Sequence, residues 1–401
     1  MKILFITHLL PYPPNCGGYI RTYNFIRCLS RNHKVDLIAY LYNLQDQNQV
    51  KFLEKICNEI RVIPLQRKPL FPYLLMSFFN EKPYLYLRDY SDNMKKLVHK
   101  MIETNHYDIV FVEQLPMVGY VPKENHSYQI YANILISGMI MERLIKYQKN
   151  PVKRIVGNIE TKKLNKLEKN ACENHNLTIT ISENDKQVLE SWDLSSDNIV
   201  TIPMGVDLDQ YKPLKLNYNS RNIILLGLAR FLPNIDGIIY FCQKIYPKVK
   251  KACPDAHLYI VGSEPPKKVR NLGVDGEISV TGFVEDLESF LTNTGVFVVP
   301  LRVGGGVKVR TLNALAMGLP TVSTSVGIEG IDVTHGKNVL IANTPDSFAK
   351  AVIDVLTNIE LKKTLCEYGP LLIKEKYTWD IVFNQINYVI NSIEKEKFGV
   401  N

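Results

Sequence analysis

A glycine triplet followed by basic side chains is the clearest indication of chemistry in this sequence. The triplet directly follows the apolar run FVVPL, and the residues after it have helical spacing. The relevant residues are Gly304, Gly305, Gly306, Lys308, Arg310 and Asn313. A loop without side chains lets a ligand approach the backbone, and the free N–H groups at a helix start favour an anion. The pattern predicts a phosphate or diphosphate site, with a tight turn as the other interpretation.

A second glycine loop lies near the start of the chain. Gly17 and Gly18 separate an apolar run at residues 2–7 from a helically spaced segment at 19–32, and a further apolar run follows at 35–41. Strand, loop, helix and strand in this order form a βαβ unit and imply a parallel sheet. Open sheets of this kind bind ligands at the carboxyl ends of their strands. We therefore expect both glycine loops to lie at the carboxyl ends of parallel strands in an α/β fold.

Length and composition limit the class of protein. A chain of 401 residues with 46% hydrophobic and 22% charged residues is typical of a globular protein with two domains. No apolar run reaches the roughly 20 residues that span a bilayer. The start MKILFITHLL lacks a small-residue cleavage site and is interpreted as a strand, which favours a cytoplasmic protein. The seven scattered cysteines predict free, mostly buried thiols.

Positive charge is concentrated in one stretch. The net charge is +8, and the segment from Arg143 to Lys169 holds nine basic residues against two acidic ones. A solvated helix face is the first interpretation of this stretch, and attraction to an anionic acceptor or to the anionic inner surface of a membrane is the alternative. The segment Leu65–Tyr90 is rich in proline, leucine and aromatic residues without a clean period. It is interpreted as an irregular excursion, or as an aromatic surface that meets lipid.

Other polar residues have weaker signals. His8 and Glu113 follow apolar runs at the ligand-binding edge, so each is a candidate for the acceptor side, with a structural role as the alternative. Ser182 is expected to cap a helix. The pair Asp207 and Asp209 resembles a metal-binding motif, but it lies in a turn and no metal site is expected. Glu329 is interpreted as a loop residue.

A break in periodicity marks the domain boundary. Pro203, Gly205 and Pro213 interrupt the pattern before a new βα alternation begins at residue 223. We expect an α/β fold with two doubly wound, Rossmann-like domains. The predicted domains are residues 1–203 and 204–378, followed by a helix at 379–401 that packs back toward the first domain.

The ordered set of motifs resembles retaining glycosyltransferases of family four, which have the GT-B fold. The similarity runs through the N-terminal glycine loop, ITISENDKQVL, VTIPMGVDLDQYKP, GLARFLPNIDG, VTGFVEDLESFL and PLRVGGGVKVRTLNALAMGLPTV. It is closest to bacterial members with a glycine triplet before the final donor-site helix. The resemblance implies two domains facing across a cleft, a nucleoside diphosphate sugar as donor and no cofactor.

The resemblance also implies roles for particular residues. Arg230, seven residues before Gly237, corresponds to an arginine that clamps the donor diphosphate, and Lys308 is expected to assist it in catalysis. Donor contacts are implied for the two glycine loops and for four further residues: Gly282, Phe283, Arg310 and Asn313.

The sequence departs from the family at four positions. Gly305 and Asn313 stand where many members have glutamates, Asp236 stands where a lysine is usual, and only Asn133 remains of an aspartate-x-histidine-asparagine signature. A front-face transfer that relies on stabilising the leaving diphosphate tolerates these losses.

We therefore expect a retaining, metal-independent transferase that acts on a glycan or lipid-linked acceptor in cell-surface polysaccharide synthesis. A non-catalytic partner that binds a nucleotide sugar or glycan is the alternative. An epimerase or hydrolase would require paired carboxylates or histidines that the sequence does not supply. Nucleic acid is not expected as a partner, because no aromatic-interleaved basic motif is present.

Overall fold

The computed structural model describes residues 1–42, 47–122, 124–227, 232–273 and 276–399. The chain forms two compact units. Unit 1 comprises Met1–Met204 together with Asp380–Asn401, and unit 2 comprises Gly205–Trp379. Unit 2 is thus an insertion in the sequence of unit 1.

Within the described ranges, unit 1 is built on a seven-stranded parallel sheet in the order β3-β2-β1-β4-β5-β6-β7. Its strands are β1 (Lys2–Leu9), β2 (Lys34–Leu41), β3 (Glu59–Pro64), β4 (Ile109–Glu113), β5 (Tyr128–Ala132), β6 (Leu177–Thr180) and β7 (Ile199–Thr201). Its helices are α1 (Gly17–Leu29), α2 (Gln47–Leu53), α3 (Leu70–Phe78), α4 (Tyr84–Asp89), α5 (Asp92–Asn105), η2 (Leu115–Tyr120), α6 (Ser137–Lys146), α7 (Pro151–Glu173), α8 (Glu183–Glu190), η3 (Ser196–Asn198) and α16 (Trp379–Phe398).

The described part of unit 2 has a six-stranded parallel sheet in the order β10-β9-β8-β11-β12-β13. Its strands are β8 (Asn222–Leu226), β9 (His257–Val261), β10 (Ile278–Gly282), β11 (Val296–Val299), β12 (Thr321–Ser323) and β13 (Leu340–Ile341). Its helices are α9 (Leu232–Tyr240), η4 (Phe241–Ile245), α10 (Tyr246–Ala252), α11 (Lys267–Arg270), η5 (Asn271–Gly273), α12 (Leu287–Leu291), α13 (Val309–Ala316), α14 (Pro345–Thr357) and α15 (Ile359–Lys376).

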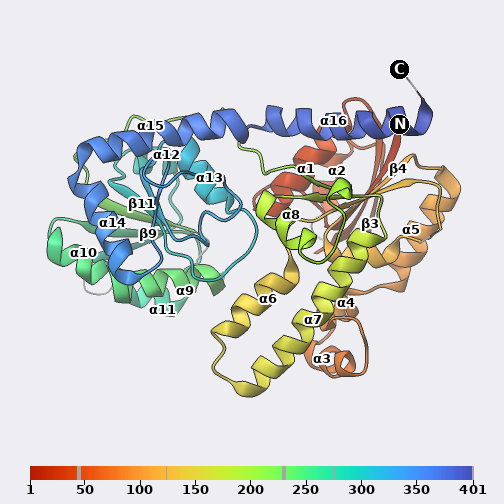
Figure 1. Cartoon of the computed structure of the whole chain (residues 1–401), viewed down its shortest axis with the longest axis horizontal. Helices are drawn as coiled ribbons and strands as arrows, with labels where there is room; N and C mark the ends of the chain where they lie inside the picture. Colours follow the sequence, from red (N-terminus) through yellow and green to blue (C-terminus); the bar gives the residue numbers. More distant parts are fainter. Residues whose placement is uncertain (43–46, 123, 228–231, 274–275, 400–401) are drawn as a thin grey trace. The chain divides into compact units, whose positions relative to one another are not determined.

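Each sheet is buried on both faces, as a doubly wound fold requires. In β8, Ile223 and Leu225 pack into one apolar cluster, and Ile224 between them packs into another on the opposite face. Figure 1 shows helices on both sides of each sheet. The predicted α/β class with two parallel-sheet domains is confirmed.

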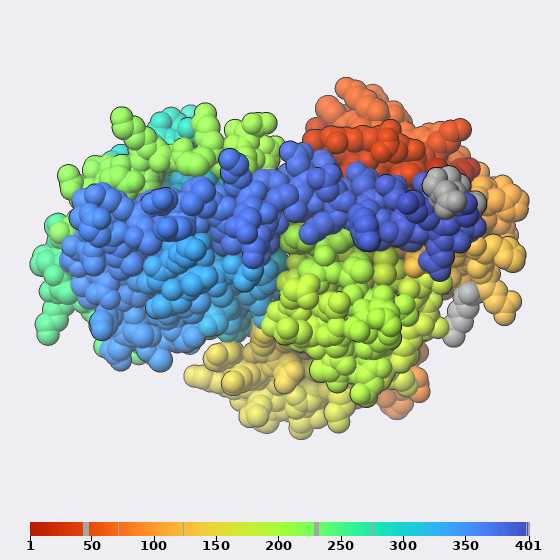
Figure 2. Space-filling model, turned by 45° about the horizontal axis from the view of Figure 1, so that its top comes forward, coloured from red at the N-terminus to blue at the C-terminus, as the bar shows by residue number. Residues whose placement is uncertain are grey.

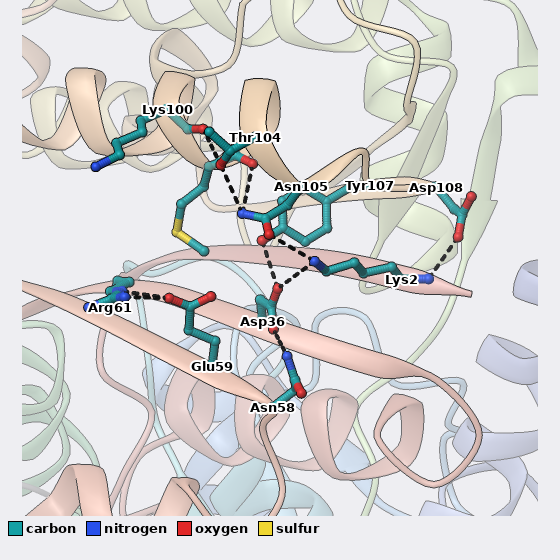
Figure 3. A network of polar contacts seen from close by, with 11 residues as sticks. Lys2, Asp36, Asn58, Glu59, Arg61, Lys100, Thr104, Asn105, Tyr107 and Asp108 are labelled. Carbon is teal, nitrogen blue, oxygen red and sulfur yellow. Dashed lines mark hydrogen bonds and ion pairs between the residues drawn. The ribbon is translucent and has the colours of Figure 1, made fainter.

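The amino-terminal edge of the unit 1 sheet is closed by a polar network (Figure 3). The buried carboxylate of Asp36 accepts hydrogen bonds from Tyr107 Oη and Asn58 Nδ2, each at 2.7 Å. Lys2 adds its Nζ at 3.8 Å from Asp36, and its backbone N–H donates to Asp108 at 2.7 Å. These contacts lie opposite the edge that carries the glycine loop. The carboxyl edge is therefore left for ligands.

The segment Leu65–Tyr90 differs from its sequence interpretation. It is not irregular throughout, because it contains α3 and α4. Buried Glu160 of α7 accepts hydrogen bonds from Ser77 Oγ and from the backbone N–H of Tyr84 at 2.8 Å. Packing on α7, and not an apolar period of their own, stabilises these short helices.

Several local predictions are confirmed. Ser182 caps α8 by accepting from the backbone N–H of Asp185 at 3.1 Å. All seven cysteines are free, and five of them are buried. In the described ranges, no helix combines the length and the apolar character that crossing a membrane requires.

Candidate functional site

Both glycine loops follow strands where the strand order reverses. In unit 1 the order reverses between β1 and β4, and in unit 2 it reverses between β8 and β11. The loop with Gly17 and Gly18 follows β1, and the glycine triplet follows β11. Crevices at such reversal points are the usual ligand sites of open α/β sheets. The topology therefore places both loops where a ligand is expected.

The glycine triplet has a backbone that other residues rarely adopt. Gly304 has φ 147° and Gly306 has φ 64°. Side chains at these positions would strain the loop as well as fill it. The loop leads directly into α13, which has neither a side-chain cap nor an acidic residue in its first turn. The first N–H groups of α13 are thus available to an anion.

Lys308 is the N-cap residue of α13, and its side chain folds back over the triplet. Its Nζ donates to the carbonyl of Gly306 at 2.6 Å and lies 3.5 Å from Glu329 Oε2. The Lys308 side chain is almost fully buried. A buried ammonium group is thus fixed beside the loop. Glu329, interpreted from the sequence as a loop residue, is the carboxylate that holds it.

Arg310 connects α13 to the segment that follows β8. Its guanidinium donates to Asn234 Oδ1 at 2.7 Å and to the carbonyl of Leu226 at 3.3 Å. A Cβ on Gly227 would lie 2.2 Å from Arg310 Nη1, so only glycine leaves room for this contact. Burial lowers the pKa of Arg310 to about 10, and the group remains charged at neutral pH. It therefore adds positive charge and joins α13 to the last residue of β8 and to α9.

A further cation, which sequence reasoning missed, is paired with Asp236. Asp236 receives two hydrogen bonds from Arg302, at 2.9 Å from Nε and 2.5 Å from Nη2. The Arg302 guanidinium also lies 4.5 Å from the centre of the Tyr240 ring. An aspartate where the family has a lysine is therefore accompanied by an arginine from the glycine loop. The two residues are 66 positions apart, so no local pattern reveals the pair.

The remaining donor-side candidates are less constrained. Asn313 lies one turn after Arg310 on α13 and is half-buried. Gly282 ends β10 with φ 71°, and Phe283 next to it is 77% exposed. An exposed aromatic ring offers a stacking surface for a nucleobase. Arg230 lies outside the described residues. Each of these donor-side assignments stays a prediction.

In unit 1, Gly17 and Gly18 form the first turn of α1, which likewise lacks a side-chain cap and an acidic first turn. Arg21, one turn later, is fully buried and donates to the carbonyls of Ile202 and Pro203 at 2.9 and 3.1 Å. It thus ties α1 to the last residues before unit 2 begins. No local pattern marks Arg21 as a positioned residue, because its partners are remote in sequence.

Glu113 ends β4 and is fully buried beneath α1. Its carboxylate accepts from Thr22 Oγ1 and from Thr7 Oγ1, the latter at 3.2 Å. Burial raises the pKa of Glu113 to about 7, although both hydroxyls and the nearby charge of Arg21 oppose the shift. In this arrangement the carboxylate positions α1 below its glycine loop. Direct contact with an acceptor stays a prediction.

His8 lies on the opposite face of the sheet from Glu113. Neighbouring Thr7 contacts Glu113, and successive side chains of a strand point to opposite faces. His8 Nε2 lies 3.7 Å from Asp89 Oδ2, and Asp89 is held by Arg88 at 2.8 Å. Burial lowers the pKa of His8 despite the charge of Asp89. The two acceptor-side candidates therefore do not form a catalytic pair with each other.

Two further candidates belong to structural contacts. Asn133 is buried at the end of β5 and donates to Glu168 Oε1 of α7 at 2.6 Å. Asp207 Oδ1 accepts from the backbone N–H groups of Asp209 and Gln210 at 2.9 and 3.3 Å. Asn133 thus joins a strand to a helix, and the Asp207 carboxylate stabilises its own turn.

Comparison with known proteins gives a family match in unit 2. Residues 222–358 match the family model described as Glycosyl transferases group 1. Over 400 residues the chain is 27% identical to an uncharacterized 44.6 kDa protein in the cps region of Klebsiella pneumoniae, covering 96% of this chain and 98% of that protein.

Two solved structures share the fold over the whole chain. Sucrose-phosphate synthase from Thermosynechococcus elongatus superposes with a TM-score of 0.70 at 15% identity, covering 99% of this chain and 100% of that one. Anabaena HepE in complex with UDP-glucose superposes with a TM-score of 0.63 at 15% identity, covering 98% and 100%.

Proposed function

We propose that this chain, a GT-B-type glycosyltransferase with a Glycosyl transferases group 1 domain at residues 222–358, transfers a sugar from a nucleoside diphosphate to a glycan or lipid-linked acceptor. The observation that carries the proposal is the buried Lys308 ammonium, fixed over an open glycine loop at the start of α13. The UDP-glucose in the HepE complex supports a nucleotide sugar as donor. The relative in a cps region supports a role in surface polysaccharide synthesis.

In the proposed reaction the acceptor hydroxyl attacks the anomeric carbon on the face that the diphosphate leaves, so the configuration is retained. The bond between the anomeric carbon and the diphosphate oxygen breaks, and a leaving-group oxygen takes the acceptor proton. Negative charge grows on the diphosphate, where the N–H groups of α13 and the Lys308 ammonium stabilise it. Arg230 is proposed as a further cation on the same group. No metal is required in this scheme.

The proposed place of action is the cytoplasmic side of a membrane. A lipid-linked acceptor would be presented at an anionic lipid surface, and the basic stretch Arg143–Lys169 favours such a surface. His8 and Glu113 remain the proposed acceptor-side residues of unit 1. In this role His8 lies on the sheet face where its ring contacts that of Tyr40, and Glu113 holds α1 through Thr22.

A second candidate function is non-catalytic binding of a nucleotide sugar or glycan in support of an active transferase. One observation favours it: Asn133, the remaining residue of the acceptor signature, is buried and committed to Glu168. Gly305 and Asn313 also replace the two family glutamates.

Nucleotide release separates the two functions. The purified chain is incubated with UDP-, GDP-, ADP- and dTDP-sugars, with and without a membrane extract, and released nucleotide is measured. We expect release from one donor, dependent on the extract and insensitive to a chelator, with retained configuration in the product. Tight donor binding without release on any extract would favour the second function.

Variants at two arginines test the proposed chemistry. Arg230→Ala should lower transfer by about 10²–10³-fold. Arg270→Ala is the matched control, because Arg270 is exposed in unit 2 and its guanidinium donates to the backbone carbonyl of Pro265 in a neighbouring turn. Equal activities of the two variants would show that the clamp is wrongly assigned.

A further inference from the structure

The basic stretch of unit 1 divides into two halves with different surroundings. In the half after Glu160, Lys163 and Lys166 contact the neighbouring segment that contains α3, and Lys169 contacts a carboxylate of α7 itself. Lys163 Nζ donates to Ser77 Oγ at 2.9 Å, Lys166 pairs with Glu81 at 2.9 Å, and Lys169 lies 4.0 Å from Glu173. This inner half fastens α3 and the following turn to α7.

The outer half forms the end of a helical hairpin. The helices α6 and α7 meet at a short connection, and the hairpin end (yellow) stands away from the sheet of unit 1 in Figure 1 and projects from the surface in Figure 2. Asn150 caps α7 at this end, accepting from the backbone N–H of Lys153 at 3.1 Å. Gly157 lets the helices approach closely, since a Cβ there would lie 2.5 Å from Ile145 Cγ1. The hairpin end is therefore a well-packed, projecting part of unit 1.

Charge and apolar surface occur together at this end. We define the tip as residues 144–155; its basic residues are Lys146, Lys149, Lys153 and Arg154, and its exposed apolar residues are Leu144, Tyr147, Val152 and Ile155. Val152 is 66% and Ile155 is 61% exposed. No acidic residue occurs from Arg143 to Ile159. Among the described residues, no carboxylate pairs with the four basic side chains.

The segment with α3 extends this surface. Its C-terminal end contacts α7 through Ser77 and Glu160, and Figure 1 shows α3 beside α7. Among the described side chains of this segment, five apolar ones are about half exposed or more: Leu70, Leu75, Met76, Phe78 and, at 95%, Phe79. The sequence from Arg61 to Asn80 contains no acidic residue. Two neighbouring segments thus expose aliphatic and aromatic groups beside unpaired positive charge.

We propose that the tip and the exposed side chains of α3 dock unit 1 on an anionic lipid bilayer. Basic residues next to aliphatic and aromatic ones fit a headgroup layer above acyl chains. A second copy of the chain would bring like charges together, and a glycan offers no apolar layer for valine, isoleucine and methionine. The inference rests on the proposed function in one respect, because it supplies the surface from which a lipid-linked acceptor would be taken.

Co-sedimentation of the full chain with vesicles tests the proposal. The vesicles contain phosphatidylcholine alone, or equal parts of phosphatidylcholine and phosphatidylglycerol. We expect binding only to the anionic vesicles and weaker binding at high salt. The variant K146Q/K149Q/K153Q/R154Q should bind about 10²–10³-fold more weakly. The variant K244Q/K251Q/K267Q/K268Q is the matched control, because it removes the same charge from exposed positions of unit 2.

A second pair of variants tests the apolar contact. Phe79→Ser should weaken binding several-fold and make the remainder more sensitive to salt, whereas Tyr388→Ser, at an exposed aromatic residue of α16, should not. Both positions are exposed, so thermal melts of the variants should match that of the parent chain.

The outcomes are distinct from those that test the proposed function, because vesicle binding needs no donor. Equal loss in the two quadruple variants, or no binding of the parent chain, would overturn the docking surface and leave the transferase assignment standing. Vesicle binding that depends on the tip, without nucleotide release from any donor, would support the docking surface and overturn the transferase assignment. If the tip variant loses affinity for dextran sulfate but not for vesicles, the surface serves an anionic glycan and the lipid assignment is wrong.

Discussion

At the scale of residues, the candidate donor site is a set of cations with fixed positions. Lys308 is held between a carbonyl of its own loop and Glu329 from a later loop. Arg302 is held by Asp236, and Arg310 by Asn234. Each cation therefore has a specific partner that fixes its direction before any ligand arrives. Prior orientation of charge is what stabilises a departing diphosphate at little reorganisation cost.

Substitution of Lys308 and of its partner should have unequal effects. Lys308→Ala removes the ammonium and should lower turnover by about 10²–10³-fold. Glu329→Gln keeps the Gly306 contact, so we expect a loss of only about three- to tenfold. Nucleotide release with saturating donor measures both. Lys350→Ala, at an exposed lysine of α14, is the control and should match the parent. A Glu329 variant as damaged as the Lys308 variant would mean that the ion pair itself is required.

The place of Arg310 depends on the missing side chain of residue 227. In Gly227→Ala the new methyl group occupies the space of Arg310 Nη1, so the guanidinium must leave the Leu226 carbonyl. We expect a higher KM for the donor and a stability loss of about 1 kcal/mol. Arg310→Lys should act similarly, and the double variant should be no worse than Arg310→Lys alone. Additive losses in this cycle would show that Gly227 acts through another contact.

At the scale of elements, α7 organises much of unit 1. Its buried Glu160 holds the end of α3 and the start of α4, and its buried Glu168 accepts hydrogen bonds from Tyr131 and Asn133 of the β5 region. Both carboxylates are in the middle of a helix whose outer surface is basic. The sequence shows the basic surface but not these two contacts, since each joins residues at least 35 positions apart.

Glu168 makes the stability of the protein depend on pH. Burial raises its pKa to about 8, against the hydrogen bonds from Tyr131, Ser137 and Asn133. A raised folded-state pKa contributes stability that is complete below the unfolded value near 4.5 and is lost as pH rises through about 8. Glu113, with a pKa of about 7, acts in the same direction. The melting temperature should therefore fall as pH rises from the acidic to the alkaline side of this window.

The variant Glu168→Gln cannot titrate and should show a flatter dependence of melting temperature on pH. Thermal melts in a series of buffers measure the slope, which is independent of any constant effect of the substitution on stability. Glu173→Gln is the control, because Glu173 is exposed at the end of the same helix. Identical slopes in the parent chain and in Glu168→Gln would mean that Glu168 is ionised in the folded protein.

At the scale of the whole molecule, the sequence predicted the architecture better than the site. Apolar runs, glycine loops and helical spacing recur in order, so both parallel sheets and both loop positions followed from local patterns. Arg21 and Arg302 escaped notice, and Glu329 was interpreted only as a loop residue, because their partners are distant in sequence. The segment with α3 was misjudged for the same reason, since its helices depend on Glu160 of α7. Long-range contacts decide which polar residues are positioned, and one sequence does not display them.

The division into units makes the last helix essential to the first domain. The residues of unit 2, Gly205–Trp379, separate α16 from the rest of unit 1 in the sequence. Asp380–Asn401 nevertheless belongs to unit 1. Its apolar residues are buried at helical spacing: Val382, Phe383, Ile386, Ile390 and Ile393. On the α1 side, Cys28 Sγ lies 3.6 Å from Asn387 Oδ1, and the Arg31 guanidinium lies 5.2 Å from the centre of the Phe383 ring.

Truncation after residue 379 should therefore unfold unit 1 and spare unit 2. Burying five such side chains contributes roughly 8–15 kcal/mol, which equals the whole stability of a typical domain. Limited proteolysis of the truncated chain should degrade residues 1–204 and leave a resistant fragment covering 205–379, whereas the full chain should resist throughout. Because the proposed donor residues of unit 2 lie in the resistant fragment, calorimetry should still detect nucleotide-sugar binding to it. Loss of both units together would show that they unfold as one, and that α16 supports more than the domain it belongs to.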